Sequence, residues 1–181
     1  MFEPTFVVTG RFRSGTSMMM HAISLASSLV PVVDLGVEAV IRSRQIDALY
    51  DPNPNGYYHA GVGVYPDNVP GSLVKCSSIF WTAVNPGDYY VVEIVRDENE
   101  RAASLMAGFG LTEGELATKN YVCGEMDLHS RTDVNLITFN YADVVADPVS
   151  AFTVLQQAGW PISNIMAAAN TVTADLYRHR V

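Results

Sequence analysis

The residues best suited to chemistry lie near the start of the chain, in the run Gly10-Arg-Phe-Arg-Ser-Gly15-Thr-Ser17. A short apolar segment from Phe6 precedes this run, and residues that favour a helix follow it from about Thr16. A loop between a strand and a helix turns the chain so that backbone N–H groups and the positive end of the helix dipole converge. This arrangement predicts an anion site, and a phosphate is the expected ligand.

The loop departs from the Walker A pattern G-x-x-x-x-G-K-[ST] at one informative position. When the outer glycines are aligned, Thr16 stands where the lysine is expected and Ser17 where the magnesium-binding hydroxyl is expected. Positive charge is found instead at Arg11 and Arg13, whose guanidinium groups can bind phosphate or sulfate oxygens through paired hydrogen bonds. Without the lysine, the loop is poorly equipped to stabilise a γ-phosphoryl group during its transfer.

A second set of candidate anion-binding residues follows the apolar run at residues 89–95, which predicts a strand. Arg96 ends this run, Asp97 is expected to cap the next helix, and Ser104 lies about two helical turns further on. Arg96 and Ser104 would then bind one anion from two sides. The alternative is that Arg96 pairs with Asp97 or Glu100 at the surface and that the serine is incidental.

The two sets resemble the nucleotide-binding residues of the sulfotransferase family, and particularly of its small bacterial and phage-type members. The run Arg13-Ser14-Gly15-Thr16-Ser17 is similar to the 5′-phosphosulfate loop of that family. Arg96 and Ser104 match, in type and interval, the pair that holds the 3′-phosphate of the nucleotide. The Asn-Pro-x-Gly-Tyr-Tyr pattern at residues 53–58 is also similar to one found in the small members.

The resemblance implies a donor, 3′-phosphoadenosine 5′-phosphosulfate, and in-line transfer of its sulfuryl group to a hydroxyl or amine without a metal. It implies that the loop holds the 5′-phosphate, that Arg13 stabilises the bridging oxygen, and that the acceptor is a small molecule or a glycan. The expected donor-binding residues are Arg11, Arg13, Ser14, Gly15, Thr16, Ser17, Arg96 and Ser104.

An acceptor hydroxyl usually needs a general base close to its proton. The candidates are His59, with an unperturbed pKa of about 6.5, Glu38 and Asp34. His59 is favoured over Glu38, and both are predicted catalytic residues together with Arg13. Lys75, within an otherwise apolar strand, is interpreted as a side chain that extends to solvent.

The order of elements predicts the fold class. Strands are expected at residues 73–77, 89–95 and 134–139, and helices at residues 16–29, 37–49, 111–125 and 143–158. Pro148 is expected to kink the last of these helices or to begin a new one. Strands separated by helical segments indicate a parallel sheet covered on both faces. The resemblance adds a P-loop NTPase-like architecture, so the prediction is a three-layer α/β/α sandwich with a central, mainly parallel sheet in a single domain of residues 1–181.

Composition limits the partners. The net charge of −8 argues against nucleic acid, because a phosphate-binding surface is broadly basic. Cys76 and Cys123 have no metal-like spacing and are interpreted as buried thiols in a reducing compartment. No secretory signal and no membrane-spanning run is evident, so a cytoplasmic location away from membranes is predicted. The oligomeric state is not predicted.

Two other function classes stay open at this point. One is a nucleotide or small-metabolite kinase with an aberrant loop, which magnesium-dependent ATP hydrolysis would support. The other is a non-catalytic module that binds a nucleotide and has lost turnover.

Overall fold

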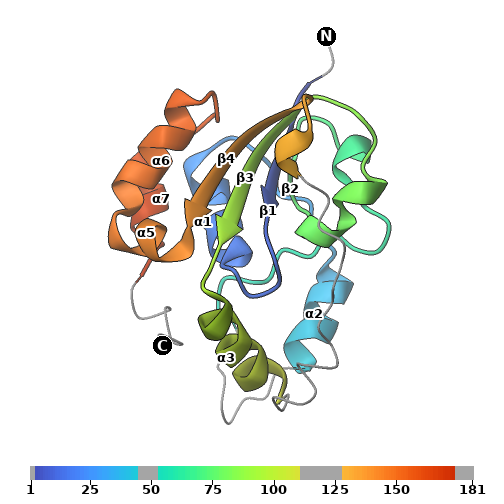
Figure 1. Cartoon of the computed structure of the whole chain (residues 1–181), viewed down its shortest axis with the longest axis vertical. Helices are drawn as coiled ribbons and strands as arrows, with labels where there is room; N and C mark the ends of the chain where they lie inside the picture. Colours follow the sequence, from blue (N-terminus) through green and yellow to red (C-terminus); the bar gives the residue numbers. More distant parts are fainter. Residues whose placement is uncertain (1–2, 45–52, 111–127, 174–181) are drawn as a thin grey trace.

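The computed structural model describes residues 3–44, 53–110 and 128–173, and these residues surround a parallel sheet (Figure 1). The strands lie in the order β2-β1-β3-β4, and each neighbouring pair is parallel. Their bounds are β1 Thr5–Thr9, β2 Leu73–Lys75, β3 Tyr89–Val95 and β4 Val134–Asn140. The predicted α/β fold with a central parallel sheet is therefore confirmed.

The strand before the glycine loop, β1, lies inside the sheet. Val7 is in register with Val74 of β2 on one side and with Val91 of β3 on the other. All five residues of β1 are buried. Since an inner parallel strand is covered on both faces, its side chains are apolar in both directions, and residues 6–8 form a continuous apolar run. Burial of β1 holds the loop that follows it at the carboxyl edge of the sheet.

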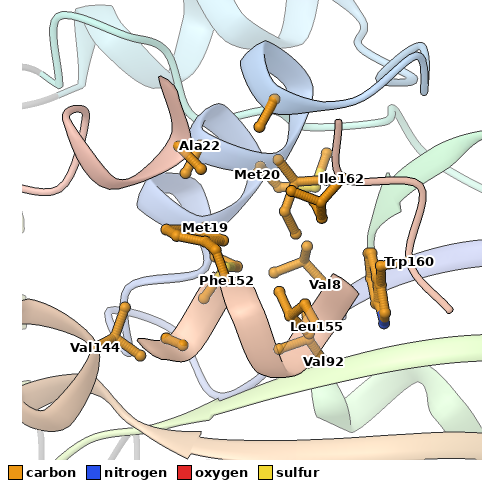
Figure 2. Close-up of a cluster of buried hydrophobic side chains, with 14 of the residues drawn as sticks. Val8, Met19, Met20, Ala22, Val92, Val144, Phe152, Leu155, Trp160 and Ile162 are labelled. Carbon is orange, nitrogen blue, oxygen red and sulfur yellow. The ribbon is translucent and has the colours of Figure 1, made fainter. Parts of the chain in front are cut away.

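Helices cover one face of the sheet, and their bounds are α1 Thr16–Ala26, α5 Tyr141–Ala146, α6 Pro148–Gln157 and α7 Ile165–Ala169. On this face Val8 of the sheet packs in one cluster with Met19 and Met20 of α1 and with Phe152 of α6 (Figure 2). These four side chains are fully buried. Each such side chain contributes about 1.5–3 kcal/mol by leaving water, so the cluster fixes the direction in which the N-terminus of α1 points.

Among the described residues, short 3-10 turns and not α-helices cover the opposite face: η1 Pro66–Asn68, η2 Ser78–Ala83 and η3 Leu128–Ser130. Trp81 is fully buried there, and its Nε1 donates to Thr9 Oγ1 at 3.0 Å. Cys76 belongs to the same cluster, and burial raises the pKa of its thiol to about 12. The burial predicted for the Cys76 thiol is thus confirmed, whereas Cys123 lies outside the described residues.

Helix boundaries differ from the predicted ones where a side chain competes with the helix. The new helix start predicted as one possibility at Pro148 is confirmed, because Pro148 begins α6 and Asp147 caps it by accepting from the Ser150 N–H at 3.0 Å. The first helix ends at Ala26, since Ser27 is already extended. The helix expected at residues 111–125 lies outside the described residues.

Two further helices, α2 Leu35–Ser43 and α3 Glu98–Phe109, lie beyond the carboxyl ends of the strands (Figure 1). Asp34 caps α2 by accepting from the Gly36 and Val37 N–H groups, and Asp97 caps α3 in the same way. The cap predicted at Asp97 is therefore confirmed. Within the described parts of the chain, no helix has the length and apolar character needed to cross a bilayer.

Candidate functional site

The loop between β1 and α1 approaches its neighbours so closely that only glycine fits at its ends. A Cβ added to Gly15 would lie 2.3 Å from the Tyr141 ring, and one added to Gly10 would lie 2.5 Å from the Ile94 carbonyl oxygen. Gly15 also has a φ of 108°, which side-chain-bearing residues rarely adopt. Within the described residues, no side chain caps the N-terminus of α1 at Gly15. The first N–H groups of α1 therefore remain for an anion.

Arg13 is held in a left-handed conformation, with a φ of 70°, and its side chain reaches α3. Its Nε donates to Ser104 Oγ at 3.0 Å. The guanidinium of Arg96, at the end of β3, donates to the Arg13 carbonyl oxygen at 3.3 Å. The glycine loop, the end of β3 and α3 are thus joined through three side chains that were selected in the sequence as anion-binding residues.

Arg96 is nearly buried and has several partners. Its Nε donates to Glu100 Oε2 at 3.1 Å, and its guanidinium lies 4.7 Å from the centre of the Tyr141 ring. The pairing with Glu100, which the sequence offered as an alternative, is present. It does not turn Arg96 away from the loop, because Arg13, Arg96 and Ser104 line one cleft of about 850 Å³.

The other loop residues differ in exposure. Arg11 lies at the rim of the cleft, 46% exposed, and pairs with Glu98 at 2.5 Å. An exposed pair of this kind is worth about 0–1 kcal/mol, so it leaves Arg11 able to change partner. Thr16 and Ser17 line the cleft at the start of α1. The Ser14 hydroxyl is buried and has no hydrogen-bond partner among the described residues.

Lys75, at the end of β2, is a site residue that the sequence reasoning missed. Its ammonium donates to the Tyr57 carbonyl oxygen and to Ser17 Oγ, the latter at 3.3 Å, and it lines the cleft. The interpretation of Lys75 as a side chain that extends to solvent was therefore wrong. Burial lowers the pKa of Lys75 to about 7; Glu38 opposes this shift and Arg13 adds to it. The signal available in the sequence was a cation at the carboxyl end of a strand.

Of the three candidate bases, His59 is the one that lines the cleft. Burial, and next the charge of Lys75, lower the pKa of His59 to about 4, so the ring is neutral at neutral pH. Glu38 does not line this cleft: its buried carboxylate accepts from the Tyr57 N–H at 2.8 Å and the His59 N–H at 2.6 Å. Asp34 caps α2 and does not line the cleft either.

These contacts correct the role given to Glu38. Both of its oxygens are used to hold residues 57–59 in place, and reaching an acceptor would leave two backbone N–H groups without partners. Glu38 is thus a positioning residue for His59. Tyr58, between the two held amides, has a φ of 57° and its hydroxyl lies 2.8 Å from His21 Nδ1, on α1.

The charge of the cleft is opposite to that of the chain. Its described lining contains no Asp or Glu side chain, although the whole chain carries a net charge of −8. Its cationic residues are Arg11, Arg13, Arg44, Lys75 and Arg96. The described residues also contain no group of three or more His, Cys, Asp and Glu side chains that could hold a metal ion. The cleft is therefore suited to a ligand with more than one anionic group.

Comparison with known proteins adds little to this geometry. No protein-family model matches the chain, and no curated protein does. Among solved structures, the unliganded crystal structure of a sugar kinase from Janibacter sp. HTCC2649 is similar, with a TM-score of 0.44 and 10% sequence identity. The similarity covers 86% of this chain and 98% of that one. A likeness this weak carries no argument about function.

Proposed function

We propose that the protein is a sulfotransferase that takes a sulfuryl group from 3′-phosphoadenosine 5′-phosphosulfate. One observation carries the proposal: Arg13, Arg96 and Ser104 converge on one cleft beside the N-terminus of α1. A nucleotide with phosphates at both its 5′ and 3′ positions needs two neighbouring anion sites, and these residues supply them. The proposal rests on the sulfotransferase-like sequence pattern together with this convergence.

Each group has a distinct task in the proposed reaction. The amides of the loop and the hydroxyls of Thr16 and Ser17 bind the 5′-phosphate, and Arg96 with Ser104 binds the 3′-phosphate. The acceptor oxygen or nitrogen bonds to sulfur while the bond from sulfur to the bridging phosphate oxygen breaks. Negative charge grows on that bridging oxygen, where Arg13 stabilises it in a site whose lining lacks competing carboxylates.

The proton of the acceptor passes to His59 in this scheme. His59 is neutral at neutral pH and lines the cleft, so it has a free pair of electrons to accept the proton. Its lowered pKa makes it a weak base, which suits an acceptor whose proton leaves as the bond to sulfur forms. Glu38 keeps the backbone of His59 in place through the 2.6 Å hydrogen bond.

One observation favours a second candidate, a nucleotide or small-metabolite kinase. The Lys75 ammonium donates to Ser17 Oγ, so a lysine lies beside the loop although the loop sequence itself contains no lysine. A lysine at this location could neutralise a transferred phosphoryl group. A kinase would bind ATP with magnesium in preference to a bisphosphate, and this difference decides between the two.

The test is calorimetric titration of the whole chain with adenosine 3′,5′-bisphosphate and with ATP, each with and without magnesium. We expect the bisphosphate to bind without magnesium, and Arg13→Ala, Arg96→Ala and Ser104→Ala to weaken it. Each arginine substitution should cost about 1.5–3 kcal/mol, the usual worth of a charged hydrogen bond.

Arg101→Ala is the matched control, because Arg101 lies on α3, pairs with Glu98 and does not line the cleft. It should change the affinity by less than about 1 kcal/mol. Tighter magnesium-dependent binding of ATP would favour the kinase. Bisphosphate binding without sulfate transfer to any of a broad set of alcohols and amines would favour a non-catalytic module.

A further inference from the structure

The cleft extends beyond the proposed donor site to a wall formed by one face of α2. Val37, Ile41 and Arg44 line it, while the neighbouring side chains Glu38 and Arg42 line a separate, smaller pocket. Positions 37, 41 and 44 are spaced by four and then three residues, so they share one helix face. This face of α2 is therefore an apolar strip that ends in an arginine.

A second segment that lines the same cleft is also apolar. Val62, Val64 and Tyr65, which follow His59 in the chain, line the cleft, and Val62 is fully exposed. An exposed apolar wall of this kind gains stability when an apolar ligand covers it. Together with Val37 and Ile41, these residues form a region suited to the hydrocarbon body of a ligand.

Arg44 differs from the other cationic residues of the cleft. Arg13 donates to Ser104, Arg96 pairs with Glu100, and Lys75 donates to Ser17. The Arg44 side chain, in contrast, makes no hydrogen bond or ion pair with any part of the chain that the structure describes, and it is exposed. Its charge is therefore fully available to a ligand.

The distance along α2 sets the length of that ligand. Glu38 holds the His59 backbone, and Arg44, the residue that directly follows α2 and caps it, lies six residues after Glu38. A helix rises about 1.5 Å per residue, so Arg44 lies about 9 Å beyond Glu38, and thus beyond the His59 backbone that Glu38 holds, along the axis of α2. One molecule of moderate size can therefore meet both residues.

From this arrangement we infer that the acceptor is an amphiphilic anion: an apolar body with a hydroxyl or amine at one end, near His59, and a carboxylate or sulfonate-type group at the other, bound by Arg44. The inference rests on the proposed function, since it names the acceptor class of the same site. Two oxygens of either anionic group can accept from the two parallel N–H groups of the guanidinium fork. The apolar strip of α2 and the 62–65 segment enclose the body between the two ends.

The test uses matched probes that share one body and differ only in the terminal group: para,para′-hydroxybiphenyl carboxylate, the corresponding sulfonate, and the neutral carboxamide. Binding of each to the whole chain is measured by calorimetry, with and without saturating adenosine 3′,5′-bisphosphate. The wild type should bind the carboxylate or the sulfonate about tenfold more tightly than the carboxamide, as a charged hydrogen bond predicts. The anionic probe that binds with the higher affinity identifies the group that Arg44 prefers to bind.

Arg44→Gln should remove this preference while leaving the affinity for the bisphosphate unchanged. Arg42→Gln is the matched control, because it removes the same charge from the same helix but from the face that lines the other pocket; it should retain the preference. Equal binding of charged and neutral probes by the wild type, binding of none of them, or a preference that survives Arg44→Gln would overturn the inference. Failure of the bisphosphate to bind rejects the donor assignment separately, because the probes are also titrated without it.

Discussion

Replacing Lys75 by methionine should change how the stability of the protein depends on pH. The unfolded chain keeps this proton up to a pH near the ordinary lysine value of 10.5, whereas the folded chain releases it near pH 7. Between these values the unfolded state binds more protons, so the free energy of unfolding rises with pH. For this group the rise from about pH 7 to about pH 8.5 amounts to about 1.5 kcal/mol. Methionine has a similar shape and no proton to lose, so this contribution should vanish in Lys75→Met.

The measurement is urea unfolding of both proteins at several pH values in that interval. Subtracting the two curves removes the contributions of groups that both proteins share. The interval ends at about pH 8.5 because the Cys76 thiol, with a folded pKa of about 12 against an ordinary value of 9.0, lowers stability at higher pH. Parallel curves for wild type and Lys75→Met would refute the reasoning, since they would mean that the ammonium keeps its ordinary pKa.

Two further substitutions test the site. Gly15→Ala should lower the free energy of unfolding by at least about 2 kcal/mol and abolish bisphosphate binding, because the new methyl group would lie 2.3 Å from the Tyr141 ring. Gly63→Ala is the control, because Gly63 also has a positive φ, of 78°, but no atom lies within 4 Å of the new methyl group. It should cost only the backbone strain of about 1 kcal/mol. Glu38→Gln should lower the rate of sulfuryl transfer, because it weakens the contact that holds His59, and should leave the bisphosphate affinity within about twofold. An equal loss of transfer rate and bisphosphate affinity would contradict the positioning role.

The local structure around the candidate site that was predicted correctly depends on short intervals in the sequence. The loop between β1 and α1 follows from an apolar strand, two glycines and a helix start within a dozen residues. Asp97 as the cap of α3 follows from local spacing in the same way. That Arg96 and Ser104 would lie near the loop depended on the resemblance to a family, because 83 residues separate Arg96 from the Arg13 carbonyl that it contacts.

The parts that were missed depend on contacts between distant segments. Lys75 meets Ser17 across 58 positions, and whether a cation in an apolar strand turns inward or outward is decided by this packing. Glu38 was predicted to be catalytic because an acceptor hydroxyl usually needs a general base, and a carboxylate can serve as one. The structure instead uses it to accept two backbone N–H groups 19 and 21 positions away. The short 3-10 turns that cover the face opposite the helices have no helical periodicity, so the sequence pattern could not predict them.

The contact between Gly15 and the Tyr141 ring has a consequence for the order in which the protein becomes competent during its synthesis. The loop leaves the ribosome before the aromatic surface on which it rests, because that surface belongs to α5, more than a hundred residues later. The same ring supports Arg96. A nascent chain in which β4 and α5 have not yet been synthesised thus carries the complete loop sequence without the surface that shapes it, and the loop cannot reach its final conformation until α5 has been made.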